Sequence, residues 1–333
     1  MDSEQFKIMR KQLAASSSIV ITTHHNPDGD AIGSSLALYL LLSRLGYNVA
    51  TIVPNDYPSF LKWLPGSKDV IIYEDSSSVC DRLISEADII FSLDYNSLSR
   101  VKLFTEKLAA SEATKILIDH HVDPSDEFDF VHSRTSISST CELLYEFIEG
   151  IGYINLIDRD IAECLYVGIM TDTGSFSYAS NNSQTYEIAA SLIKKGIDAE
   201  QIHRSVYDTY SENRMRLLGF CLSDRLIVNL KYKTAYIWLT QNDLARFNHQ
   251  VGDTEGVVNY ALSIEGVTLA ALFTEGNGRV RISFRSKGEF SVNEFARKHY
   301  NGGGHRNASG GDSFIGMAET LKKFDELLPL YFG

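Results

Sequence analysis

Short runs of β-branched and apolar residues alternate with helical segments in the N-terminal part of the chain, and this alternation constrains the fold more than any other feature. The predicted strands cover residues 18–23, 48–53, 70–73, 88–93 and 115–118. One intervening helical segment runs from Ala31 to a glycine cap at Gly46. Such alternation predicts an α/β domain in which a parallel sheet carries helices on both faces.

The pattern changes near residue 223, where paired strands replace the strand–helix alternation. Strands are predicted at residues 226–230 and 235–239, and at residues 267–274 and 280–285. The segment Glu275-Gly-Asn-Gly278 between the last two is typical of a hairpin turn. We therefore expect a parallel-sheet domain at residues 1–195, a helical connector at residues 196–222 and a smaller mixed α/β domain at residues 223–333.

Charge and cysteine content limit the classes of function. The net charge is −12, whereas proteins that coat long duplex nucleic acid need many basic contacts to phosphates. A small phosphorylated substrate remains compatible with this charge, because bound divalent cations can reverse the local sign. Four widely spaced cysteines without a CxxC pair indicate buried, reduced thiols in a cytosolic protein. They are Cys80, Cys141, Cys164 and Cys221.

The sequence lacks the features of an exported or membrane protein. Its first residues, Met1-Asp2-Ser3-Glu4, have neither the basic region nor the apolar core of a signal peptide. The most apolar run, residues 31–42, is far shorter than the roughly 20 residues that a membrane span needs. We expect a cytoplasmic protein that does not bind a membrane.

Residues that can bind metal ions stand directly after three predicted strands. They are His24, Asp28 and Asp30 after the first strand, Asp94 after the fourth, and Asp119, His120 and His121 after the fifth. Open parallel sheets bind their ligands at the carboxyl ends of their strands. Another carboxylate, Asp172, lies in a loop after an apolar helix. Singly, each has an ordinary interpretation, such as Asp30 as a helix N-cap, but together they indicate a metal site.

These motifs resemble the DHH phosphoesterase superfamily, which is named for the trio present here as Asp119-His120-His121. The segments at residues 24–30, Asp94, the trio and Thr171-Asp-Thr-Gly-Ser175 occur in the order found in that family. Near the C-terminus, Gly302-Gly-Gly-His305-Arg-Asn-Ala-Ser-Gly-Gly311 is similar to the glycine-rich motif of the DHH-associated domain. The chain departs from that motif at Ser309, where relatives usually carry alanine. The closest likeness is to the nanoRNase/pAp phosphatase type.

The resemblance implies a site with two divalent cations. One cation would be held by His24, Asp28 and Asp94, and the other by Asp30, Asp94, His120 and Asp172. Mixed Asp and His ligands suit Mn²⁺, with Mg²⁺ or Co²⁺ as alternatives. Asp94 would bridge the cations, Asp119 would orient the histidine pair, and His121 would face the substrate as a phosphate contact or proton donor.

The second domain is expected to bind the substrate. Gly302, Gly303 and Gly304 would expose backbone N–H groups to an anion, with His305 beside them, although a run of three glycines is often only a flexible turn. Arg285 is the predicted clamp for a terminal phosphate; its ordinary interpretation is an exposed strand arginine. In the first domain, Ser139-Thr140 resembles a further family segment, but the pattern is also that of a helix start.

We therefore expect a metal-dependent phosphoric ester hydrolase that acts on short single-stranded oligonucleotides, on 3′-phosphoadenosine 5′-phosphate (pAp), or on both. A soluble phosphodiesterase for cyclic or linear dinucleotides and a catalytically idle nucleotide-binding protein are the alternatives. Manganese-dependent pyrophosphatases and RecJ-type exonucleases differ in their other domains. A nicotinamide-cofactor dehydrogenase would need glycines after the first strand, where aspartates stand instead. A homodimer remains open.

Overall fold

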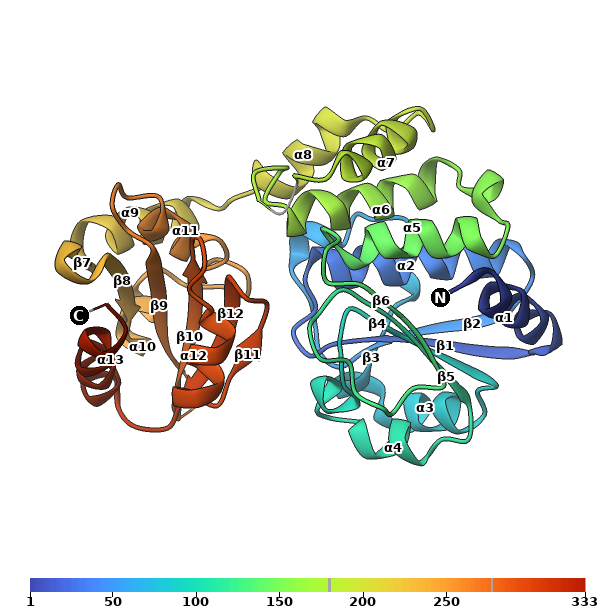
Figure 1. The fold of residues 1–333 in the computed structure, drawn as a ribbon, viewed down its shortest axis with the longest axis horizontal. Coiled ribbons are helices and arrows are strands. Elements are labelled where there is room, and N and C mark those ends of the chain that lie inside the picture. The colour runs from blue at the N-terminus through green and yellow to red at the C-terminus, as the bar shows by residue number, and fades with distance from the viewer. Residues whose placement is uncertain (179–180, 277, 333) are drawn as a thin grey trace. The chain divides into compact units, whose positions relative to one another are not determined.

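The computed structural model describes residues 1–178, 181–276 and 278–332. The chain divides into two compact units, Met1–Thr209 and Tyr210–Gly333, and each contains its own sheet (Figure 1). The segment expected to connect the domains forms two helices, α8 (Ala199–Tyr207) and α9 (Glu212–Asp224). The division between the units falls between these helices.

The sheet of the N-terminal unit is entirely parallel, as predicted. Its strand order is β3-β2-β1-β4-β5-β6, so the chain reverses its direction of travel across the sheet between the neighbours β1 and β4. The strands are β1 (Ser18–Thr23), β2 (Asn48–Val53), β3 (Ile71–Ile72), β4 (Ile89–Leu93), β5 (Thr114–Asp119) and β6 (Phe130–Ser133). Ligand sites of open α/β sheets lie at such a reversal point.

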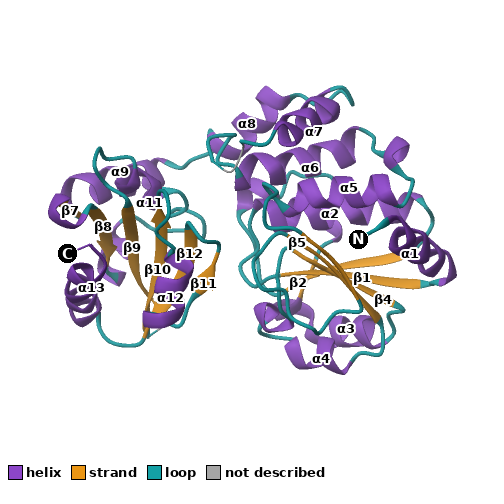
Figure 2. Cartoon of the chain, viewed as in Figure 1, coloured by secondary structure: helices purple, strands orange, loops and turns teal. Residues whose placement is uncertain are grey.

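Helices cover both faces of this sheet (Figure 2), which confirms the predicted fold class. One face packs against α1 (Ser3–Ala15), α2 (Gly29–Arg44), α5 (Thr140–Gly150), α6 (Arg159–Asp172) and α7 (Ser183–Ile193). The other packs against α3 (Tyr73–Ser85) and α4 (Thr105–Ala110). The two hydrophobic cores are therefore separated by the sheet.

Helices α2 and α6 approach each other so closely that a side chain is excluded between them. A Cβ added to Gly33 in α2 would lie 2.5 Å from the backbone oxygen of Cys164 in α6, a distance that neither backbone can relieve without moving. This contact fixes the first turn of α2, which contains Asp30, relative to the last residue of α6, Asp172. The close packing thus brings two of the predicted ligands together.

The sheet of the C-terminal unit is mixed, with the order β11-β12-β10-β9-β8-β7. Only β8 and β9 pair in parallel; the other neighbours are antiparallel. The strands are β7 (Leu226–Asn229), β8 (Thr234–Leu239), β9 (Leu269–Gly276), β10 (Arg279–Ser286), β11 (Gly303–Gly304) and β12 (Ala308–Ser313). The strand pairs expected from the sequence form, and residue 277 of the predicted hairpin turn lies outside the described residues.

Helices also flank the C-terminal sheet. On one face, α12 (Val292–His299) and α13 (Met317–Phe332) enclose an aromatic core. On the other, α9 and α11 (Val257–Leu262) pack against β8 and β9, while the short α10 (Gln241–Arg246) follows β8. The helices on this second face therefore lie over one half of the sheet.

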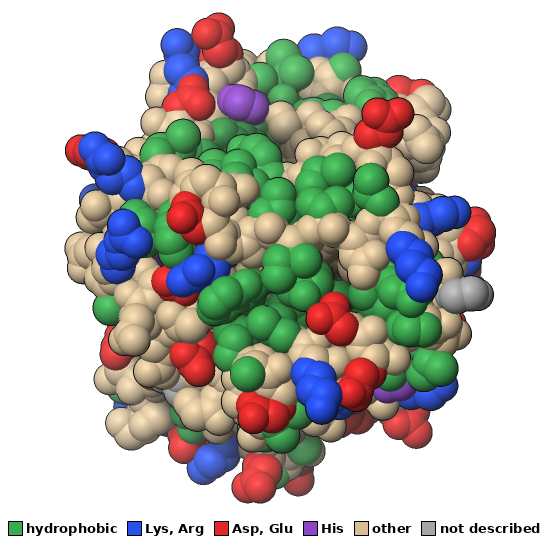
Figure 3. Space-filling view, turned by 90° about the vertical axis from the view of Figure 1, so that its left-hand side faces the viewer, with side chains coloured by type: hydrophobic (Ala, Val, Ile, Leu, Met, Phe, Trp, Pro, Cys, Tyr) green, Lys and Arg blue, Asp and Glu red, His purple; other side chains and the backbone are tan. Residues whose placement is uncertain are grey.

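One edge of the C-terminal sheet is β7, and it exposes hydrophobic side chains. Ile227 and Val228 in this strand and Leu230 just after it are all exposed. Figure 3 looks onto the side of the molecule where β7 and α13 lie, and hydrophobic side chains gather there between residues of both charges.

Burial of the thiols agrees with the sequence prediction. All four cysteines are buried and free, and burial raises the pKa of the Cys141 and Cys164 thiols well above the usual range. Within the described ranges, none of the helices combines the length and the apolar character required to cross a bilayer.

Candidate active site

The predicted ligands of the N-terminal unit converge at the carboxyl edge of its sheet. Strands β1, β4 and β5 are direct neighbours, and each ends next to one of the segments singled out from the sequence. Their ends deliver His24, Asp94 and the Asp119-His120-His121 trio. Asp172 reaches the same place from the last residue of α6, not from the loop expected for it.

Asp94 has an uncommon backbone conformation, which neighbouring residues hold in place. Its φ is +64°, a left-handed conformation that is uncommon for a residue with a Cβ and is found where function demands it. Its N–H donates to Ile118 O at 3.2 Å. The next residue, Tyr95, is fully buried, and its hydroxyl lies 2.7 Å from Ser92 Oγ and 2.6 Å from Thr22 Oγ1. These anchors fix where the Asp94 carboxylate lies.

A first cluster joins His24, Asp28 and Asp94. His24 Nδ1 lies 3.0 Å from His25 O, and this hydrogen bond leaves Nε2 facing the carboxylates. Nε2 is 3.4 Å from Asp94 Oδ2 and 3.9 Å from Asp28 Oδ2. A histidine whose second nitrogen is held by a carbonyl has the arrangement usual for metal ligands.

Asp28, not Asp30, is the N-cap of α2. Its Oδ1 accepts from Asp30 N at 3.1 Å and from Ala31 N at 3.2 Å, so the helix begins before Ala31, the start expected from the sequence. The capping oxygen is Oδ1, and Oδ2 is the oxygen that faces His24. Because Asp28 caps the helix, Asp30 does not serve as the N-cap.

A second cluster joins Asp30, His120 and Asp172. His120 Nε2 lies 3.4 Å from Asp172 Oδ2 and 3.8 Å from Asp30 Oδ2. The same nitrogen is 3.6 Å from Asp94 Oδ1. Asp94 therefore directs Oδ2 toward His24 of the first cluster and Oδ1 toward His120 of the second.

The separations between donor atoms fit divalent cations. Distances of 3.4–3.9 Å between the histidine nitrogens and the carboxylate oxygens exceed the roughly 2.7–3.2 Å of a hydrogen bond. Two atoms that each lie about 2.1 Å from one cation, about 90–110° apart, are separated by about 3.0–3.4 Å. The histidine–carboxylate pairs of each cluster therefore need only a small contraction to share a cation.

The electrostatics of the site also indicate a need for positive charge. Burial and the neighbouring charges of Asp30 and Asp28 raise the pKa of Asp94 well above its usual value. Burial disfavours the charged form of His120, yet the carboxylates around it, first that of Asp172, raise its pKa to about 9. In the metal-free chain a proton on His120 thus supplies charge that a bound cation would otherwise supply.

Asp119 and His121 form a pair that also approaches Asp94, because His121 Nδ1 lies 3.8 Å from Asp94 Oδ1. His121 Nδ1 lies 2.6 Å from Asp119 Oδ1, and Asp119 is fully buried. Burial lowers the pKa of His121, which favours a neutral ring that donates from Nδ1 to the carboxylate. This hydrogen bond fixes the orientation of the His121 ring.

In the C-terminal unit, the glycine-rich segment forms a tight hairpin. Gly303 and Gly304 pair with Gly310 and Ser309 across β11 and β12. A Cβ on Gly302 would lie 2.0 Å from Gly310 O, so glycine is required there by the close approach of two backbones. His305 closes the turn, with its N–H donating to Ala308 O at 2.7 Å.

Arginines line one side of strand β10. Its outward-facing residues alternate with the core residues and are Arg279, Arg281, Ser283 and Arg285. Arg285 pairs in register with Ala308 of β12, three residues from His305, which places it near the hairpin. Its Nη1 donates to Phe284 O at 3.0 Å. The predicted phosphate clamp therefore belongs to a row of cationic residues.

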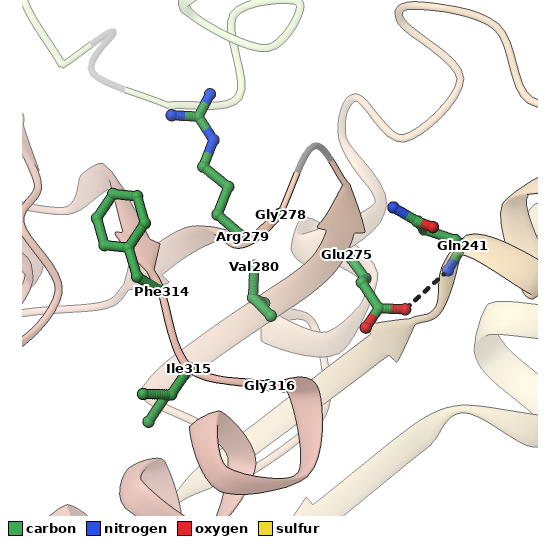
Figure 4. A pocket seen from close by; sticks show the side chains of 8 residues that line it. All are labelled: Gln241, Glu275, Gly278, Arg279, Val280, Phe314, Ile315 and Gly316. Carbon is green, nitrogen blue, oxygen red and sulfur yellow. Dashed lines mark hydrogen bonds between the residues drawn. The ribbon is translucent and has the colours of Figure 1, made fainter.

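A cavity of about 290 Å³ opens at the other end of β10 (Figure 4). Arg279 and Phe314 are among its lining residues, and Gln241 N donates to Glu275 Oε2 at 3.1 Å beside it. Arg285 is six positions after Arg279, about 20 Å along a strand at about 3.4 Å per residue. The cavity is thus distinct from the glycine hairpin.

Some residues at these sites carried no functional signal in the sequence. Helix α12 brings Arg297 Nε to 3.7 Å from where a Cβ of Gly303 would stand, with Asn293 Oδ1 at 4.0 Å, yet the segment is an ordinary amphipathic helix. In the N-terminal unit, the backbone N–H of Cys141 binds Asp30. A backbone donor leaves no trace in a sequence.

The chain matches known families and proteins over most of its length. The profile described as "DHH family, N-terminal domain" matches residues 18–169, and that of the DHHA1 domain matches residues 229–328. The chain is 30% identical to a protein of Streptococcus mutans named probable bifunctional oligoribonuclease and PAP phosphatase NrnA, covering 97% of both chains. It is 28% identical to the Bacillus subtilis protein named bifunctional oligoribonuclease and PAP phosphatase NrnA, covering 92% of this chain and 96% of that one.

A solved structure is similar to the whole chain. It is an exopolyphosphatase-related protein from Bacteroides fragilis, 44% identical, with a TM-score of 0.95 over 99% of this chain and 97% of that chain. The similarity therefore covers both units.

Proposed function

The chain belongs to the DHH family of phosphoesterases, and we propose that it hydrolyses short oligonucleotides to mononucleotides and removes phosphate from pAp with the help of two divalent cations. The observation that best supports this proposal is the placement of Asp94, whose two carboxylate oxygens face His24 and His120 of two different clusters. A shared carboxylate is what two neighbouring cations require, because it offsets their mutual repulsion. The activities named for the related NrnA proteins point to the same substrates.

The two clusters supply the proposed ligand sets. His24, Asp28 and Asp94 would hold one cation, and Asp30, Asp94, His120 and Asp172 the other. When bound, divalent cations supply Lewis-acid chemistry, since they offset negative charge on a phosphoryl group and acidify water. Carboxylates combined with imidazoles favour Mn²⁺ over Ca²⁺, while Mg²⁺ and Co²⁺ stay possible by donor type.

His121 takes the substrate-facing role in this proposal. Asp119 holds its Nδ1 at 2.6 Å, so Nε2 is the nitrogen left for the substrate. Nε2 of the neutral ring has no proton; once a bound phosphoryl anion favours protonation of the ring, Nε2 donates to a phosphoryl oxygen or transfers its proton to the leaving oxygen. Because Asp119 is buried and bonded to the ring, its part is to orient His121 and not to bind a cation.

The C-terminal unit is assigned to substrate binding. Arg285 lies on β10 near the glycine hairpin, where its guanidinium can bind a terminal phosphate through two parallel hydrogen bonds. Gly302, Gly303, Gly304 and His305 form the edge beside it. In this proposal, residues 1–195 carry out catalysis and residues 223–333 bind the substrate's phosphate.

A substrate panel tests the proposal. Purified protein is incubated with Mn²⁺ or Mg²⁺ and di- to pentanucleotides, pAp, a cyclic dinucleotide and pyrophosphate, beside an Asp94→Ala control. We expect mononucleotide from the short oligonucleotides and phosphate from pAp with Mn²⁺, and no turnover by the variant. Hydrolysis of the cyclic dinucleotide alone would move the substrate class to that alternative. Near-normal turnover by Asp94→Ala would remove the proposed cation site.

A further inference from the structure

The N-terminus of α5 is directed at two of the buried carboxylates. Thr140 N donates to Asp30 Oδ2 at 2.6 Å, and Cys141 N donates to Asp30 Oδ1 at 2.9 Å. The hydroxyl of the same threonine, Thr140 Oγ1, donates to Asp94 Oδ1 at 2.9 Å. Thr140 and Cys141 are fully buried, and Asp30 and Asp94 are 1% and 2% exposed.

The way α5 begins leaves these donors available. Its N-cap, Ser139, accepts only from Glu142 N among the first N–H groups of the helix. The N–H groups of Thr140 and Cys141 have no acceptor inside the helix, because the first turn of any α-helix lacks carbonyl partners. Asp30 therefore completes the capping of α5 from 110 residues away in the chain, at the end of the helix that favours negative charge.

Helix α6 closes the arrangement from the opposite side. A Cβ on Gly168 would lie 2.8 Å from Asp30 Oδ1 and 2.1 Å from Cys141 Sγ. The Asp30 carboxylate is thus confined between α5 and α6. Its Oδ1 faces Cys141 N, and its Oδ2 faces both Thr140 N and His120 Nε2, the latter at 3.8 Å. In this confined orientation only Oδ2 is presented to the second cluster.

We infer that Thr140 is a positioning residue for cation binding: its backbone N–H and its hydroxyl fix the carboxylates of Asp30 and Asp94 in one shared orientation. The inference rests on the proposed function, because it assumes that these carboxylates bind cations. One residue thereby couples a ligand from α2 to the bridging ligand that follows β4. The carboxylates are pre-set before a cation arrives, so little ordering is left for the binding step.

A purely structural role for Thr140 makes a different prediction. If its hydroxyl only stabilised the fold, its loss would lower the stability and leave cation affinity unchanged. Thr185 provides a matched control for that case. It is also a fully buried threonine, and its Oγ1 donates to Glu142 Oε2 at 2.9 Å, a carboxylate outside both clusters.

The experiment compares Mn²⁺ affinity and thermal stability in four variants of the full chain. Thr140→Val removes the hydroxyl at constant shape, Thr140→Ser restores it, Thr185→Val is the matched control, and Asp94→Ala removes the bridging ligand. Mn²⁺ binding is measured by isothermal titration calorimetry, and Tm is measured in EDTA. Removal of a group that orients metal ligands typically costs about 10–100-fold in affinity.

We expect Thr140→Val to weaken Mn²⁺ binding by about tenfold or more, Thr140→Ser to remain near the wild-type affinity, and Thr185→Val to lower Tm while Mn²⁺ affinity stays unchanged. Unchanged Mn²⁺ affinity in Thr140→Val, with binding lost in Asp94→Ala, would overturn this inference alone. Unchanged affinity in Asp94→Ala would overturn the proposed cation site itself. Equal losses of affinity in Thr140→Val and Thr185→Val would reduce Thr140 to a structural residue.

Discussion

The two units of the chain hold their functional side chains in opposite ways. In the N-terminal unit the carboxylate of Asp94 is 2% exposed and lies beside histidines of two clusters as well as Thr140. In the C-terminal unit the arginines of β10 lie on the outward side of their strand and are half-buried or exposed. One candidate site is an interlocked buried network, and the other lies on the more accessible side of a strand.

This difference predicts how strongly a substitution in each unit should affect activity. A buried carboxylate with several partners cannot be removed without leaving the others uncompensated. An arginine on the solvent-accessible side of β10 can be replaced with the loss of fewer buried contacts. We therefore expect changes in the N-terminal unit to abolish turnover, and changes in the C-terminal unit to weaken substrate binding by degrees.

The largest expected effect comes from Asp94→Asn. This change keeps the shape of the side chain but removes the charge that links the clusters, so kcat should fall by at least about 10²–10³-fold, as for loss of other charge-stabilising groups. Because burial and the charges of Asp30 and Asp28 raise the pKa of Asp94, the ionised carboxylate is disfavoured there, and a neutral amide should cost the metal-free protein little in Tm. Steady-state kinetics and thermal unfolding in EDTA measure both. Turnover within threefold of the wild type would break the contrast between the units.

Glycine replacements provide a stability test with opposite signs in the two units. Gly33→Ala places a Cβ 2.5 Å from Cys164 O, and such overpacking typically costs about 1–3 kcal/mol. Gly219 in α9 has open space around it, so Gly219→Ala should stabilise its helix by up to about 1 kcal/mol. Urea denaturation measures both free energies of unfolding. Equal effects would mean that the α2–α6 contact is less tightly constrained than the structure indicates.

Arg285→Ala tests the graded behaviour of the C-terminal unit. Loss of a charge-assisted contact to phosphate should raise KM for dinucleotides by about tenfold, equal to about 1.4 kcal/mol, and leave kcat nearly unchanged. KM for an artificial aryl phosphate ester should not change, since that substrate has no second phosphate to anchor. Arg216→Ala, on the exposed surface of α9, is the matched control. Equal increases for both substrates would argue against a phosphate clamp.

The smallest expected effect is the release of protons when Mn²⁺ binds. The metal-free chain keeps His120 protonated below a pKa of about 9, whereas a histidine that binds a cation must be neutral. At pH 7.5, Mn²⁺ binding should release about one proton from His120, and affinity should rise with pH until the pKa is passed. Titration calorimetry in buffers of different ionisation enthalpy counts the protons. An exchange of zero protons would show that His120 is neutral before the cation binds.

Much of the N-terminal fold could be predicted because its signals are local. The β-branched run at residues 18–23 and the one at residues 48–53 coincide with the bounds of β1 and β2. Strand β6 was missed, since Phe130–Ser133 is short and owes its conformation to pairing with β5. Helix α2 begins at Gly29, two residues before the predicted start at Ala31, because the carboxylate of Asp28 caps the helix there.

The proposed site could be predicted in its members but not in its geometry. Strand ends pointed to Asp94 and the Asp119-His120-His121 trio, and parallel neighbours bring such ends together. The sequence could not show which oxygen of Asp94 faces which histidine, nor that α5 caps Asp30 from 110 residues away. Those features depend on tertiary contacts, which leave no periodic pattern in the chain.

The most direct test of the central claim is a crystal structure of the Mn²⁺-loaded protein with anomalous scattering measured at the manganese edge. We predict two peaks about 3.5–4 Å apart, one bonded to Asp94 Oδ2 and His24 Nε2 and the other to Asp94 Oδ1 and His120 Nε2. A single peak, or two peaks of which only one is bonded to Asp94, would contradict the proposal that this carboxylate joins the two clusters.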